Sequence, residues 1–152
     1  MMQEKDYLTF EDLEVHKAAR AFRKAMYDVA RRLPDTEKFG LASQIRRAAV
    51  SLMNNIAEGH GRYHYLDQIK FMFQARGSLQ ELVDDLTVCE DEKYLLPAEI
   101  ANLRQDSLLV MMLLKGYVRF LRERKTGESS VVRETSPPYN ASDDDPFADW
   151  PI

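Results

Sequence analysis

Apolar residues recur at every third or fourth position in four long stretches of the chain, which is the spacing of amphipathic α-helices. The predicted helices run from Thr9 to about Leu33, from about Glu37 to Glu58, from about His64 to Lys93, and from Pro97 to about Arg124. No stretch alternates apolar and polar residues for long enough to indicate a strand. The pattern therefore predicts an all-α fold, an antiparallel up-down-up-down four-helix bundle over residues 9–125.

Several residues mark where these helices are expected to begin, end or approach one another. Thr9 is a predicted N-cap, followed by acidic residues in the first turn, and Pro34 stops the first helix. Gly59 and Gly61 are expected to end the second helix, because glycine readily takes the positive φ found just past a last turn. Gly77, in the middle of the third helix, is expected to mark a close crossing between two helices.

The second predicted helix has three distinct faces when its residues are placed at 100° intervals. Its main apolar stripe consists of Leu41, Ile45, Ala48, Leu52 and Ile56. A smaller apolar stripe on roughly the opposite side consists of Val50, Met53 and Ala57. Between them lies a polar line formed by Gln44, Arg47, Ser51, Asn55 and Glu58. An ordinary surface helix has one apolar face, so this helix is predicted to pack on two sides, against the domain core and against a partner subunit.

The polar line has two interpretations. It can be a binding site, or it can be a buried hydrogen-bonded network in which Arg47 and Glu58 are paired with groups on other helices, because buried charges need partners.

The fourth predicted helix also has an apolar face wider than a single stripe, which is typical of a contact between subunits. The residues that widen it are Leu109, Met112, Leu113 and Phe120.

Charge is unevenly distributed along the chain. The formal net charge is −4, but residues 127–152 contain six acids and one base, so the preceding part is close to neutral. Residues 1–8 are expected to be a flexible lead-in and residues 126–152 an acidic, disordered tail. Phe147 and Trp150 interrupt the acidic run and are candidate partner-binding residues, since acidic termini with aromatic residues can act as short linear ligands. The alternative is a solubilising tail, and an acidic tail can also mask a basic surface of the body.

Basic residues are concentrated on the outer face of the first predicted helix. The candidate nucleic-acid-binding residues are Arg20, Arg23, Lys24, Arg31 and Arg32, together with Arg46 and Arg62. Clusters of Lys and Arg bind phosphate groups. An ordinary solvated helix face also carries bases, and nearby acids partly offset these, so both interpretations stay open.

No residue pattern indicates catalysis, a metal ion or a cofactor. A di-iron bundle needs inward Glu-x-x-His pairs, which none of the three histidines has, and one cysteine with scattered histidines does not supply a zinc site. Cys89 shares the helical phase of Leu82 and Leu86, which predicts a small buried apolar residue. A non-enzymatic protein is therefore expected. The first residues do not resemble a secretion signal, and no apolar run approaches about 18 residues, so a cytoplasmic location is expected.

The segments QIRRAAVS and NIAEGHGR, within residues 44–62, resemble the signature of the four-helix-bundle proteins encoded in intervening sequences of bacterial large-subunit rRNA genes. The segments FEDLEVHKAARAF and FMFQARGSLQELVDDL agree with this family in order and spacing, so the resemblance covers about residues 8–122. The chain departs from the family pattern at His16, where Trp is usual, and at Met53 and Asn54, where a Pro-Ala pair is usual.

The resemblance implies a non-enzymatic bundle that assembles into a ring, commonly a pentamer, with a basic surface. Related ring-forming bundles are accessory proteins of diversity-generating retroelements, where they bind a reverse transcriptase and its template RNA. The leading hypothesis is therefore an oligomeric scaffold that binds RNA or an RNA–DNA hybrid, with a reverse transcriptase as a candidate partner. The alternative is a protein–protein adaptor with no nucleic-acid role, which uses the bundle and the acidic-aromatic tail.

Overall fold

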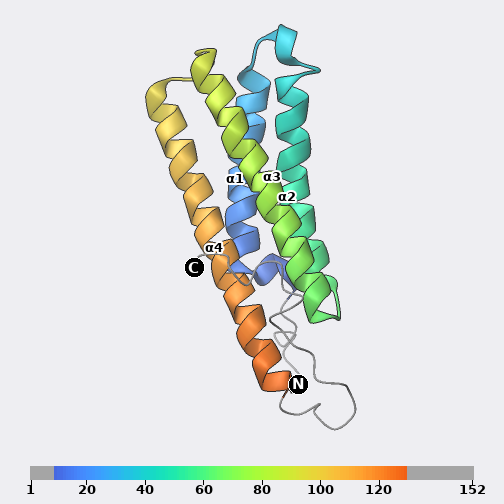
Figure 1. Cartoon of the computed structure of the whole chain (residues 1–152). Helices are drawn as coiled ribbons and strands as arrows, with labels where there is room; N and C mark the ends of the chain where they lie inside the picture. Colours follow the sequence, from blue (N-terminus) through green and yellow to red (C-terminus); the bar gives the residue numbers. More distant parts are fainter. Residues whose placement is uncertain (1–8, 130–152) are drawn as a thin grey trace, which may run out of the picture.

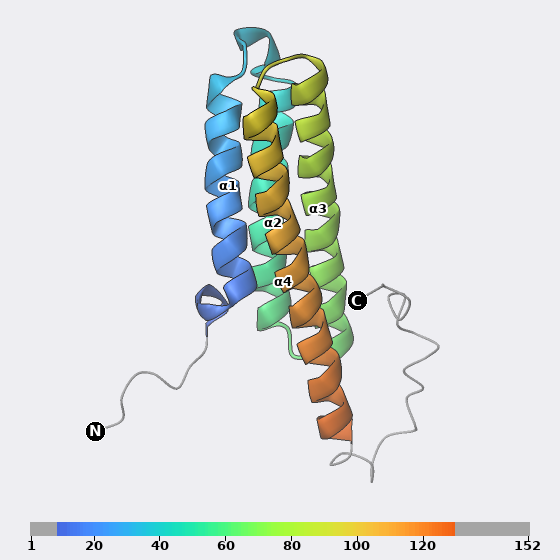
Figure 2. The same cartoon turned by 90° about the vertical axis from the view of Figure 1, so that its left-hand side faces the viewer.

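The computed structural model of the chain describes residues 9–129, with side chains described as far as Arg124. Its elements are the 3₁₀ turn η1 (Phe10–Asp12), α1 (Glu14–Arg32), the 3₁₀ turn η2 (Asp35–Glu37), α2 (Leu41–Gly61), α3 (Tyr65–Asp91) and α4 (Pro97–Ser129). The four long helices of this part run in alternating directions and are joined by short connections at the two ends of the bundle (Figure 1, Figure 2). The predicted all-α, antiparallel four-helix bundle is confirmed.

Each long helix packs against its neighbours in the chain, and α4 packs against α1, which closes the bundle. The interior contains the apolar stripes that the sequence predicts. On α2, no residue of the main stripe is more than 5% exposed: Leu41, Ile45, Ala48, Leu52 and Ile56. Cys89 is fully buried on α3, as predicted. Removal of this apolar surface from water is the main stabilising contribution to the fold.

The turn η1, just before α1, begins with a carboxylate cap. The backbone N–H of Thr9 donates a hydrogen bond to Asp12 Oδ2 at 3.1 Å, and Thr9 is the N-cap residue of η1. The prediction that Thr9 caps the first long helix is therefore wrong, because α1 starts only at Glu14 and its N-cap residue is Leu13. The cap therefore orders the chain just before α1 and fixes how α1 enters the bundle.

Other predicted helix boundaries, besides the start of α1, are wrong by a few residues. The second helix was predicted from about Glu37, but α2 begins at Leu41. The reason is that residues 35–37 form η2, and the Glu37 carboxylate accepts a hydrogen bond from the Leu41 N–H at 3.1 Å, which satisfies a donor at the start of α2. The fourth helix begins at Pro97 as predicted, but it continues to Ser129 instead of ending near Arg124.

Gly59 lies inside α2 and not at its end, so this part of the prediction is wrong. It is buried, α2 continues to Gly61, and no described glycine has a positive φ. A Cβ atom at Gly59 would lie 2.9 Å from Phe71 Cβ and 3.2 Å from the Gln68 carbonyl oxygen, and would overlap the end of the Met72 side chain. Glycine is therefore required at this position by the close approach of α3.

Gly77 does not mark a close helix crossing, so that prediction is also wrong. It is exposed on α3, and a Cβ atom added there would meet nothing within 4 Å. The position faces solvent, and the close crossing between α2 and α3 is at Gly59.

The lead-in, residues 1–8, and residues 130–152 of the predicted tail, including Phe147 and Trp150, lie outside the described residues. Within residues 9–129, no helix has the length and apolar character needed to cross a membrane.

The two glycines give a matched test of the fold. We expect Gly59→Ala to destabilise the protein by about 1–3 kcal/mol, because the methyl group overpacks the contact between α2 and α3. We expect Gly77→Ala to stabilise it by about 0.5–1 kcal/mol, because alanine has the higher helix propensity and the position is open. Urea unfolding of both variants and the wild type measures these changes, and equal effects would contradict the assignment of the crossing to Gly59.

Candidate nucleic-acid interface

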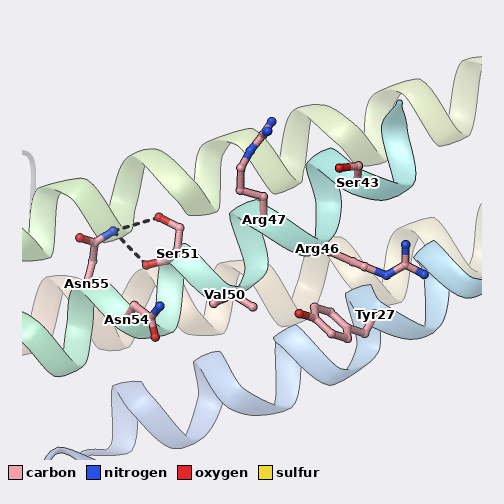
Figure 3. A pocket seen from close by; sticks show the side chains of 8 residues that line it. All are labelled: Tyr27, Ser43, Arg46, Arg47, Val50, Ser51, Asn54 and Asn55. Carbon is pink, nitrogen blue, oxygen red and sulfur yellow. Dashed lines mark hydrogen bonds between the residues drawn. The ribbon is translucent and has the colours of Figure 1, made fainter. Parts of the chain in front are cut away.

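An open pocket of about 590 Å³ lies on the outer face of α2. One of its lining residues, Tyr27, belongs to α1, and the others belong to α2 (Figure 3). The α2 residues are Ser43, Arg46, Arg47, Val50, Ser51, Asn54 and Asn55. We call this pocket the α2 groove. Its lining contains two guanidinium groups and no carboxylate, so its local charge is positive.

The two arginines of the α2 groove extend in different directions. Figure 3 shows the Arg46 side chain extending towards Tyr27 of α1, whereas Arg47 extends to the other side of α2. Val50 and Asn54 follow Arg46 at four-residue intervals and share its side of the helix. None of the ion pairs within residues 9–124 involves Arg46 or Arg47. Both guanidinium groups are therefore available to an anionic ligand.

Two residues of the predicted polar line form a small network with α3. The Ser78 hydroxyl of α3 donates a hydrogen bond to Ser51 Oγ at 2.9 Å. The Asn55 amide nitrogen donates to the Ser51 carbonyl oxygen at 2.9 Å and to Ser51 Oγ at 3.1 Å (Figure 3). Ser78 was missed by the sequence reasoning, because a serine among apolar positions gives no sign of its partner.

The other residues of the polar line do not join this network. Gln44 and Arg47 are exposed on α2. Glu58 pairs with Arg62, one turn later in the chain, at 2.7 Å. The structure therefore divides the line into a hydrogen-bonded part at α3, whose residues Ser51 and Asn55 also line the α2 groove, and a solvent-facing part, of which only Arg47 lines it.

Asp85 of α3 is a further residue that the sequence reasoning missed. It is 7% exposed, and its Oδ2 atom has no hydrogen-bond partner among the described residues. The pKa of this carboxyl is raised to about 6, mainly by burial and also by the nearby carboxylates of Asp84 and Glu81, whereas Arg47 acts to lower it. The sequence did contain a signal for its burial, because Asp85 falls in the same helical phase as the buried apolar residues of α3.

The seven predicted nucleic-acid-binding residues do not form one surface, but three of them lie at or beside the α2 groove. Arg46 lines it, and Arg31 and Arg46 together line an adjoining pocket of about 250 Å³ that also includes Lys38. Arg23 lies over the ring of Tyr27, with its Cζ atom 5.0 Å from the ring centroid. Lys38 and Arg47 add to this basic surface, although the sequence reasoning had not assigned them to it.

The other four predicted residues lie elsewhere. Arg32 pairs with Asp28 at 3.2 Å and with Glu99 of α4 at 2.9 Å, so it faces the opposite side of α1 from the groove. Arg62, at the C-terminal end of α2, pairs with Glu58, and its Cζ atom lies 4.8 Å from the centroid of the Phe71 ring. Arg20 and Lys24 are exposed on α1.

The described part of the chain contains no group of three or more His, Cys, Asp or Glu residues placed to hold a metal ion.

Residues 11–116 match the family described as 23S rRNA-intervening sequence protein. The match covers more than half of the chain and includes all of α1, α2 and α3. The chain belongs to the 23S rRNA-intervening sequence protein family. A search of curated proteins found no match. The α2 groove of this family member lies entirely within the matched residues, and the family name itself refers to ribosomal RNA.

The buried carboxyl of Asp85 on α3 gives a test of the electrostatics inside the bundle. Because its pKa is raised to about 6 in the folded protein, the folded state binds this proton more tightly than the unfolded state does. The wild type should therefore lose stability relative to Asp85→Asn as the pH rises from about 4 through about 6, by at most about 3 kcal/mol, and no further above that range.

The measurement is the free energy of unfolding of both proteins at closely spaced pH values. Asp106→Asn, which removes an exposed carboxylate of α4 that is not among the groups acting on Asp85, is the matched control. A stability difference between wild type and Asp85→Asn that does not change over this pH window would contradict the assignment.

Proposed function

We propose that this protein is a non-enzymatic RNA-binding bundle that contacts RNA through the α2 groove. The observation that carries the proposal is the lining of the groove: two guanidinium groups without ion-pair partners among residues 9–124, two asparagine side chains, and no carboxylate. Guanidinium groups bind phosphate, while amides and hydroxyls can bond to sugars and base edges.

The surroundings of the groove support a nucleic acid more than a small anion. The adjoining pocket, whose charged lining residues are Arg31, Lys38 and Arg46 together with one acid, Asp35, continues the net positive surface towards the connection between α1 and α2. Arg23 and Tyr27 add a guanidinium group and an aromatic ring on the α1 side. A surface with several separated cations suits a ligand that presents several phosphates in a row.

The proposal extends to an oligomer. Three residues of the wide apolar face of α4 are at least half exposed, which is costly for an isolated bundle and is removed by contact with a second copy: Leu109, Met112 and Phe120. A ring of copies, such as the pentamer that the family resemblance implies, would repeat the α2 groove and increase the affinity for a long RNA. A reverse transcriptase as protein partner stays a prediction from the resemblance.

The competing function is a protein–protein adaptor that makes no contact with nucleic acid. The exposed apolar residues of α4 favour it, since such a surface also fits a different protein. The two functions differ in what they require of Arg46 and Arg47: RNA binding needs both guanidinium groups, whereas the adaptor function does not.

Substitution of the two groove arginines tests the proposal. The Arg46→Ala/Arg47→Ala variant should bind a labelled RNA hairpin about 10-fold or more weakly at low salt, and its plot of log K against log salt should be shallower by about one unit per lost phosphate contact. Arg119→Ala, at an exposed position of α4, is the matched control and should leave both quantities close to those of the wild type.

Fluorescence anisotropy over a series of salt concentrations measures both quantities, and light scattering on the same samples reports the assembled mass. Two results would contradict the proposal: no binding of the hairpin by the wild type at about 50 mM salt, or equal losses in the groove variant and in the control.

A further inference from the structure

A second, more enclosed pocket lies between α3 and α4, on a different side of the molecule from the α2 groove. Its volume is about 280 Å³, and we call it the α3–α4 groove. Leu79 of α3 is fully buried at its base, while Val83, Leu108 and Met111 form its apolar walls. Arg104 is its one charged lining residue.

Exposed apolar side chains extend this groove along α4. Leu108 is 56% exposed at its edge, and Met112, one turn further along α4, is 69% exposed. Nothing in the described part of the chain covers them. A single exposed apolar residue is ordinary. Leu108 and Met112 together, beside an apolar pocket, form a surface that favours the binding of an apolar side chain.

The chain itself contains a segment with matching chemistry. Residues 143–152 read DDDPFADWPI, in which Phe147, Trp150 and Ile152 alternate with acids and prolines, and Trp150 is the only tryptophan of the protein. An aromatic ring fits an apolar pocket, and the acids need a basic surface nearby. Helix α4 supplies one wall of the apolar pocket and also a basic surface, since it contains five bases and one acid between residues 113 and 125.

We propose that residues 143–152 bind in the α3–α4 groove of their own chain, with the Trp150 or Phe147 ring in the pocket beside Leu108. The acids of the segment would then lie along the basic C-terminal half of α4. This inference does not depend on RNA binding, because it uses a surface that is separate from the α2 groove.

The length of the connecting segment permits this contact. Leu108 lies 21 residues before Ser129, the last described residue of α4, which is about 32 Å along a helix. Residues 130–146 number 17 and can span at most about 60 Å. The chain can therefore turn at the end of α4 and reach back to the groove without involving a second molecule.

Binding of the segment would cover the exposed apolar surface on the α3 side of α4 and offset part of the basic charge there. The contact with another copy proposed for Leu109, Met112 and Phe120 shares Met112 with this surface, whereas Leu109 points about 100° further round α4 than Leu108.

The single tryptophan provides the experiment, carried out on the full chain. The emission maximum of Trp150 should lie to the blue of that of a synthetic peptide of residues 143–152, and acrylamide should quench it at least about twofold less, as for an anchor side chain seated in a pocket. Leu108→Asp should return both quantities to the peptide values, because it places a charge at the pocket edge. Leu66→Asp, at a partly exposed leucine of α3, is the matched control and should change neither.

Circular dichroism checks that the variants are folded, and Met112→Asp, at the more exposed position, replaces Leu108→Asp if that variant unfolds. Peptide-like emission in the wild type, or shielded emission that survives both α4 substitutions, would overturn the proposal. Shielding that is lost in Arg46→Glu would place the segment in the α2 groove, and shielding that is lost on dilution together with a fall in assembled mass would place it between copies. Each of these outcomes also rules out the proposed contact.

Discussion

The close contact between α2 and α3 is the constraint on which the rest of the structure depends. Gly59 lets α3 approach to a distance that no side chain would permit, and nearer the middle of α2 Ser51 and Ser78 share a hydrogen bond across the same interface. These contacts fix both the separation of the two helices and the rotation of α2 about its axis. With Leu52 turned into the core, the side of α2 that carries Arg46 must face solvent.

This arrangement gives the bundle two chemically different surfaces on opposite corners. Helices α2 and α4 are diagonal partners, since α2 packs against α1 and α3 while α4 packs against the same two helices from the other side (Figure 2). The solvent face of α2 is basic and polar, and that of α4 is apolar beside a basic end. A nucleic acid and a protein segment can therefore occupy the molecule together without competing for one surface.

The two glycines show how far a single sequence can be interpreted. Gly59 and Gly77 both interrupt helical patterns, and the sequence predicted the end of a helix at the first and a close crossing of two helices at the second. The structure places the close crossing at Gly59 and solvent at Gly77. A glycine can be needed because the backbone takes an unusual conformation or because another helix comes too close for a side chain. The local sequence does not distinguish these two causes, because the second one depends on a different helix.

The sequence by itself determined the helical class, the approximate extent of each helix and the side of each helix that is buried, because apolar spacing depends only on the geometry of a single helix. It also indicated that Arg46 belongs to a basic surface. Only the tertiary structure decided that Arg46 lies beside Tyr27, that Ser78 bonds to Ser51, and that Asp85 is buried with one oxygen that no other described residue contacts by a hydrogen bond. The physical reason is that each of these contacts joins two helices, and their relative rotation and separation follow from the packing of the whole bundle.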